Sequence, residues 1–185
     1  MVDSRKTIGL LAILACALAG PSAVAFAAPQ TFDAPIFNVA GKQIGDARFI
    51  GQPGGGTQII INVSGLPPGQ HGMHIHEVGS CLAIRDTQGV ATPFAAAGGH
   101  FDPAHTGHHL GPNGGGHAGD LPNLTIDSAG NGGLAYYAPS LQVSGSDTIV
   151  GRSIVIHANP DNYTDTPPVG GSGGRIACGE IGALR

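Results

Sequence analysis

The sequence predicts an all-β fold, namely an eight-stranded antiparallel Greek-key barrel or sandwich with two long functional loops. Apolar and β-branched runs of roughly five to eight residues alternate with Gly, Pro, Asn and Asp clusters, and no run shows a helical period. The chain has 32 Gly and 14 Pro among 185 residues, which supplies the turns that short strands need. Two segments, 78–122 and 158–174, interrupt this rhythm and are long enough to indicate functional loops.

Each expected strand is an apolar or β-branched run bounded by turn residues. The strands are expected at residues 32–39, 43–50, 57–64, 71–77, 123–127, 132–137, 152–157 and 175–182. The turns are expected at residues 41–42, 53–56, 65–69 and 129–133. Turns of this kind favour antiparallel neighbours, so a Greek-key arrangement is the expected topology.

The N-terminal region has the pattern of a secretory signal peptide. Arg5 and Lys6 form a basic start, residues 8–20 form an apolar run, and small residues follow. Because Pro29 disfavours a cut directly before it, we expect cleavage after Ala27, which leaves residues 28–185 as a single domain. The apolar run is too short for a comfortable membrane span, so we expect no membrane span and an exported protein of the periplasm or the extracellular space.

Three cysteines bear on the compartment. Cys16 lies in the signal peptide, where Leu14-Ala15-Cys16 loosely resembles a lipoprotein processing site, and a lipid anchor at Cys16 is therefore an alternative. The other two, Cys81 and Cys178, should pair in an oxidising compartment, the alternative being two unpaired buried thiols. Only 11% of residues are charged and the formal net charge is −4, which argues against nucleic acid as a partner.

Nine histidines are many for a chain in which only 11% of the residues are charged, and their spacing indicates metal binding. His74 and His76 lie two apart in an expected strand, so their rings point to one face at a separation of roughly 6.6 Å. His100, His109, His117 and Asp120 offer three imidazoles and a carboxylate, a set that satisfies tetrahedral zinc in a closed structural site. An all-imidazole set is suited to copper, which has two oxidation states. Its members are His74, His76, His100 and His157.

Four blocks of sequence resemble the copper,zinc superoxide dismutase family, in the order in which the family has them. They are Gly-Leu-Pro-Pro-Gly-Gln-His-Gly-Met-His-Ile-His (65–76), Ala-Gly-Gly-His-Phe-Asp-Pro (97–103), His-Ala-Gly-Asp-Leu-Pro-Asn (117–123), and Gly-Arg-Ser-Ile-Val-Ile-His (151–157) with Gly-Arg-Ile-Ala-Cys-Gly (174–179). The surroundings of Cys81 and Asp102 are similar to those in the bacterial periplasmic branch.

The resemblance implies the same two ligand sets, with His100 bridging copper and zinc. It favours His109 over His108, because His109-Leu-Gly-Pro112 matches the family's pattern. It implies that Asp161 links ligands of both metals through hydrogen bonds and that Arg175 attracts the superoxide anion beside copper. It also implies a Cys81–Cys178 disulfide.

The implied activity is conversion of superoxide to oxygen and hydrogen peroxide, with copper alternately reduced and oxidised, zinc structural, and Arg175 and His100 as the catalytic residues. Met73 and Glu180 depart from the residues usual in the family, but neither is a ligand position. Two alternatives are a non-catalytic copper/zinc-binding protein on the same fold and a structural β-sandwich that binds zinc alone. The sequence leaves both a monomer and a homodimer open.

Overall fold

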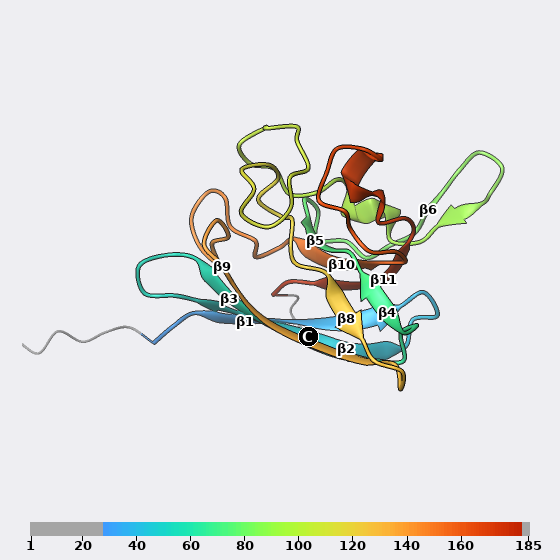
Figure 1. The fold of residues 1–185 in the computed structure, drawn as a ribbon, viewed down its shortest axis with the longest axis horizontal. Helices are drawn as coiled ribbons and strands as arrows, with labels where there is room; N and C mark the ends of the chain where they lie inside the picture. The colour runs from blue at the N-terminus through green and yellow to red at the C-terminus, as the bar shows by residue number, and fades with distance from the viewer. Residues whose placement is uncertain (1–27, 183–185) are drawn as a thin grey trace, which may run out of the picture.

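The computed structural model describes residues 28–182 and has a β architecture, in which the long loops lie on one side of the strands (Figure 1). Nine strands form the main sheet and two more form a small separate sheet. The main-sheet strands are β1 (Thr31–Asn38), β2 (Gln43–Gly51), β3 (Thr57–Ser64), β4 (Gly69–His71), β5 (Met73–His76), β8 (Leu124–Ile126), β9 (Asn131–Ala138), β10 (Ser153–His157) and β11 (Arg175–Glu180). The all-β prediction is confirmed, since the described residues form no α-helix and only two short 3-10 helices, η1 (Ala95–Ala97) and η2 (Pro168–Gly171).

Inward and outward positions alternate along β3, so one face of this strand lies in the core. In β3, Ile59, Ile61 and Val63 are buried, whereas the residues between them face outward. The turn between β1 and β2 is closed by Asn38, whose side-chain oxygen accepts the N–H groups of Ala40 and Lys42 at 3.0 Å each. The strand that the sequence predicts at residues 57–64 and the turn that it predicts at residues 41–42 are therefore both present.

The sheet closes on itself at Gly72. Its strand order is β4-β8-β9-β3-β2-β1-β11-β10-β5, so the two edge strands β4 and β5 are consecutive in the chain and separated by this one residue. The N–H of Gly72 donates to Asn159 and its carbonyl accepts from His157, both at 2.8 Å. A Cβ at this position would lie 2.5 Å from the Ser172 hydroxyl, which explains the glycine.

The strand count therefore differs from the predicted eight. The single strand expected at residues 71–77 is two short strands, because the chain leaves its pairing with β8 and turns to pair with β10. Counted as one bent strand, they restore the eight-stranded barrel.

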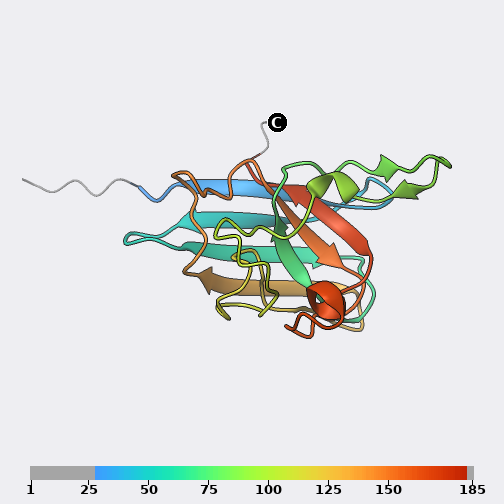
Figure 2. The same cartoon turned by 90° about the horizontal axis from the view of Figure 1, so that it is seen from above.

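Two long connections carry the remaining chain, and the views in Figures 1 and 2 place both on the same side of the barrel. The first joins β5 to β8 and contains a hairpin that the sequence did not predict, β6 (Ile84–Arg85) with β7 (Ala91–Thr92). Its strands are too short for a periodic signal, and Asp86 closes the turn by accepting the N–H groups of Gln88 and Val90. The second joins β10 to β11 and contains η2.

The expected signal peptide at residues 1–27, including Cys16, lies outside the described residues. Between residues 28 and 182, no helix has the length and apolar character needed to cross a membrane.

Candidate metal centre

Two neighbouring strands and a long loop bring four histidines together. β5 supplies His74 and His76, and β10, which pairs with β5, supplies His157 at its end. His100 follows from the first long loop and forms a backbone bridge with His76. One ring nitrogen from each of these four buried side chains lies within 4.8 Å of those of the others.

The hydrogen bonds of these rings leave lone pairs directed inward. His76 and His157 each donate an Nδ1–H to a backbone carbonyl, of Gly98 and Gly173 respectively, at 3.0 Å. Because a carbonyl only accepts, the Nε2 atoms of both rings are unprotonated, and they face each other at 3.4 Å. Nδ1 of His74 is buried and makes no hydrogen bond. Converging lone pairs repel unless a cation lies among them, so this set of four imidazoles fits copper.

A second group adjoins the first. His74, His100, His109 and Asp120 each offer one ligand atom, and these atoms also lie within 4.8 Å of one another. Asp120 is its centre: Oδ1 lies 3.1 Å from Nδ1 of His100, and Oδ2 lies 3.0 Å from Nδ1 of His109.

His117, which the sequence predicts as a zinc ligand, lies at the edge of this second group and not within it. Its Nδ1 is 3.4 Å from Oδ1 of Asp120, so the three imidazoles all turn the same nitrogen toward one carboxylate. Three of these atoms are buried without a hydrogen-bond partner, namely Nδ1 of His109, Nδ1 of His117 and Oδ2 of Asp120. Three imidazoles and a carboxylate whose ligand atoms face one another are a donor set that fits tetrahedral zinc.

The adjacent residues His108 and His109 differ in burial. The His109 side chain is 1% exposed and belongs to the second group, whereas that of His108 is 65% exposed and contacts Asp165 instead. The structure therefore brings His109, and not His108, to the candidate zinc ligands.

Asp161 lies behind both groups and contacts one ring of each. Its Oδ2 is 2.6 Å from Nε2 of His74, and its Oδ1 is 2.8 Å from Nε2 of His109. Asn123 fixes the backbone of Asp161 in both directions, since its Oδ1 accepts the N–H and its Nδ2 donates to the carbonyl. A carboxylate in this place holds each ring with its Nδ1 turned toward the candidate metal.

Burial keeps the candidate copper ligands neutral. It lowers the pKa of His74 to about 3, of His76 to about 2 and of His157 to about 4, and it lowers the pKa of His100 as well. The rings therefore retain their lone pairs at neutral pH.

Two carboxylates, of Asp120 and Asp161, control the protonation of the candidate zinc ligands. Burial alone would lower the pKa of His109, but Asp120 and Asp161 outweigh this effect and raise it to about 9. Burial likewise opposes ionisation of these two aspartates, yet their hydrogen bonds to histidine rings hold both pKa values well below the usual range. Two ionised carboxylates thus surround the candidate zinc ligands, which favours a divalent cation there.

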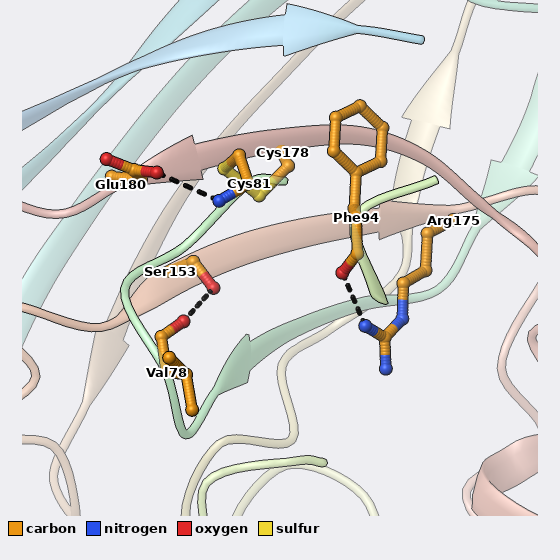
Figure 3. Close-up of a disulfide and its surroundings, with 7 residues drawn as sticks. All are labelled: Val78, Cys81, Phe94, Ser153, Arg175, Cys178 and Glu180. Atoms are coloured by element: carbon orange, nitrogen blue, oxygen red, sulfur yellow. Dashed lines mark hydrogen bonds between the residues drawn. A yellow bond between two sulfur atoms is a disulfide. The ribbon is translucent and has the colours of Figure 1, made fainter. Parts of the chain in front are cut away.

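Arg175 begins β11 and is held by two backbone carbonyls of the first long loop, of which Figure 3 shows that of Phe94. Its guanidinium donates to Phe94 at 2.6 Å and to Gly98 at 2.5 Å. The Gly98 carbonyl also accepts the Nδ1–H of His76, so one backbone oxygen joins Arg175 to a candidate copper ligand. The sequence gives no signal for these carbonyls, because any residue type supplies one.

The predicted disulfide is present, and it ties this loop to the last strand. Cys81 and Cys178 form a disulfide (Figure 3), and they lie 97 positions apart in the chain. Closing a loop of this length is worth about 4 to 5 kcal/mol in the chain-entropy model. Glu180 strengthens the junction, since its carboxylate accepts the N–H of Cys81 at 2.9 Å. Glu180, which departs from the residue usual in the family, therefore has a local structural role.

The family described as Copper/zinc superoxide dismutase (SODC) matches residues 43–181. The chain belongs to this family.

Individual relatives agree with the family assignment. The curated superoxide dismutase [Cu-Zn] of Deinococcus radiodurans is 43% identical over 182 residues, covering 97% of this chain and 98% of the relative. That of Escherichia coli K12 is 43% identical over 143 residues, covering 76% and 80%. Among solved structures, the Cu/Zn superoxide dismutase from Brucella abortus superposes with a TM-score of 0.74 at 39% identity, covering 82% of this chain and 99% of that one. The predicted resemblance to the copper,zinc superoxide dismutase family is confirmed, and these relatives are bacterial.

We predict that the metal-free protein is most stable near pH 6.5. Below this pH the unfolded chain binds protons that folded His74, His76 and His157 exclude, so stability falls as the pH falls. The raised pKa of His109 acts in the opposite direction: its contribution is complete below about pH 6.5 and is lost as the pH rises through 9. Urea unfolding of chelator-treated protein between pH 4 and 10 measures both limbs.

The control for this prediction is His109→Gln, which removes the group responsible for the alkaline limb. Its stability should no longer decline between pH 6.5 and 9, while the acid limb should remain. A metal-free protein whose stability stays constant from pH 4 to pH 7 would contradict the assignment of buried neutral rings.

Proposed function

We propose that the protein is an exported superoxide dismutase that converts two superoxide anions and two protons into oxygen and hydrogen peroxide. The proposal rests chiefly on one observation: two adjoining groups of candidate ligands, one all imidazole and the other with a carboxylate, have His74 and His100 in common and lie beside Arg175. Copper, when bound, supplies one-electron chemistry by alternating between two oxidation states, and zinc supplies a fixed charge without redox change. The proposed copper ligands are His74, His76, His100 and His157, and the proposed zinc ligands are His100, His109, His117 and Asp120.

The remaining chemistry belongs to the chain's own residues. His100 directs Nδ1 to Asp120, so Nε2 is left toward the all-imidazole group and is the atom at which a proton would be taken up and given back during turnover. Asp161 keeps the rings of His74 and His109 oriented and contributes no proton of its own.

Arg175 is the proposed guide for the substrate. In a chain of net charge −4, an anion is repelled at long range, so a local cation is needed beside the reacting position. The positive charge of Arg175 already contributes to the lowered pKa values of His76 and His157, after burial and their other contacts, which places its field at those rings. Superoxide dismutases are themselves a standard example of electrostatic steering of this kind.

Two other functions are compatible with parts of the site. A non-catalytic copper/zinc-binding protein would use the same ligands without turnover, and a structural module would bind zinc alone. The test is metal analysis of the purified protein together with a superoxide dismutation assay. Both metals with activity support the proposal, copper without activity supports the carrier, and zinc without copper supports the structural module.

We predict that Arg175→Glu lowers the rate of dismutation by at least about tenfold, because it replaces attraction of the anion with repulsion. Bound copper and zinc should stay close to the wild-type content, since Arg175 contacts carbonyl oxygens and no metal ligand side chain. The wild-type rate should also fall with rising ionic strength. Arg85→Glu is the matched control, because it makes the same charge change on the exposed hairpin. Equal rates for Arg175→Glu and Arg85→Glu would remove Arg175 from the mechanism.

The choice between the adjacent histidines has its own test. His109→Ala should abolish zinc binding, because it removes a buried ring that faces Asp120. His108→Ala should keep zinc, because that ring is exposed and points to Asp165. Zinc titration of both metal-free variants measures this directly, and loss of zinc only in His108→Ala would reverse the assignment.

We propose further that residues 1–27 direct export to the periplasm or the extracellular space and are then removed, which leaves residues 28–185 as the mature domain. The mass of the mature protein decides between cleavage near Ala27 and lipid attachment at Cys16, because the second outcome retains residues 16–27 and adds acyl chains. Sedimentation of the same sample distinguishes a monomer from a homodimer.

A further inference from the structure

A second aspartate of the loop between β10 and β11 also reaches His109. Asp161 holds the ring at Nε2, whereas Asp165, four residues later, holds the backbone: its Oδ1 accepts the N–H of His109 at 2.6 Å. The other oxygen, Oδ2, lies 2.9 Å from Nδ1 of His108. On sequence alone Asp165 is only a loop residue, because nothing in its neighbourhood marks a partner more than 50 positions earlier.

The peptide group between His108 and His109 is held on both of its polar sides. Its N–H is the donor to Asp165, and its carbonyl, that of His108, accepts the N–H of His117 at 2.9 Å. A single peptide plane therefore connects Asp165 to the backbone of two proposed zinc ligands. Hydrogen bonds in such a chain polarise one another, so an acceptor oxygen that fixes one end supports the whole chain.

Asp165 lies in a hydrogen-bonded turn. The side chain of Asn162 accepts the N–H of Thr164 and donates to the carbonyl of Thr166, each at 3.0 Å, and the N–H of Gly170 donates to Thr164 at 3.1 Å. The hydroxyl of Tyr163 accepts the N–H of Asn123, the residue that also fixes Asp161. Asp161 and Asp165 therefore lie in one hydrogen-bonded segment, and they contact the ring and the backbone N–H of His109 respectively.

We propose that Asp165 is a positioning residue of the zinc site, which fixes His109 and His117 as ligands through the peptide group between His108 and His109. The inference rests on the proposed zinc site and adds a residue that contacts no metal. The contact between Asp165 and the exposed ring of His108 has little effect on the zinc site, because a hydrogen-bonded pair of exposed side chains contributes little to stability.

The test measures zinc affinity on metal-free protein by competition with a chromophoric chelator, using zinc alone. Asp165→Ala should weaken zinc binding roughly 10- to 100-fold, the usual effect of removing a residue that orients a ligand. Asp165→Asn keeps an acceptor oxygen for the His109 N–H and should restore affinity to within about threefold of wild type. The absorption bands of cobalt(II) in the zinc site provide a second readout, and Asp165→Ala should shift them because the ligand geometry changes.

Asp127→Ala is the matched control. Asp127 is also a turn carboxylate that accepts two backbone N–H groups, of Ala129 and Asn131, but it lies between β8 and β9, outside both ligand loops. Its zinc affinity and cobalt spectrum should equal those of wild type.

Three results would overturn the proposal: a zinc affinity of Asp165→Ala within about twofold of wild type, an equal loss in Asp127→Ala, or no rescue by Asp165→Asn. A wild-type protein that binds no zinc would refute the proposed zinc site and, with it, this inference. Zinc binding and dismutation by wild type with an unaffected Asp165→Ala would refute the inference alone.

Discussion

An imidazole ring has two nitrogens, and the candidate metal centre depends on which nitrogen of each buried histidine is hydrogen-bonded to the protein and which faces the centre. At His74, His76, His109 and His157, one nitrogen is bound to a carbonyl or a carboxylate of the protein, which leaves the other directed toward its neighbours. Burial of His74, His76 and His157 in this way is unfavourable without a cation, because their unprotonated nitrogens face one another in a small space. The same arrangement gives a cation a ready set of ligands whose orientation is fixed before it arrives.

The barrel satisfies this constraint by its closure. Gly72 lets the chain pass from one edge of the sheet to the other, and the strand that follows carries two of the rings directly against β10. The loops then add the partners that the strands cannot supply. Gly98 and Gly173 offer carbonyls, Asp161 and Asp120 offer carboxylates, and the disulfide holds the first loop against the last strand.

The sequence predicts the parts of this arrangement that depend on local pattern. Strand alternation places His74 and His76 on one face, and residue type distinguishes an all-imidazole group from one that includes Asp120. Sequence could not predict the break at Gly72 or the β6–β7 hairpin, because the first is set by a change of partner strand and the second is too short to be periodic. Sequence could also not predict the hydrogen-bond partners of Arg175 and Asp165, because these partners are backbone groups, which no residue type identifies. His117 was expected inside the carboxylate group and lies at its edge, which is a matter of tertiary distance alone.

Asp161 has one further consequence. Since its two oxygens contact a ring from each group, and His100 belongs to both, any order that one ion imposes on these side chains lowers the entropic cost of binding the other. Such a coupling free energy is reciprocal, so the factor by which zinc raises the affinity for copper equals the factor by which copper raises the affinity for zinc. The order in which the two metals are supplied therefore changes the path of assembly but leaves the final equilibrium unchanged.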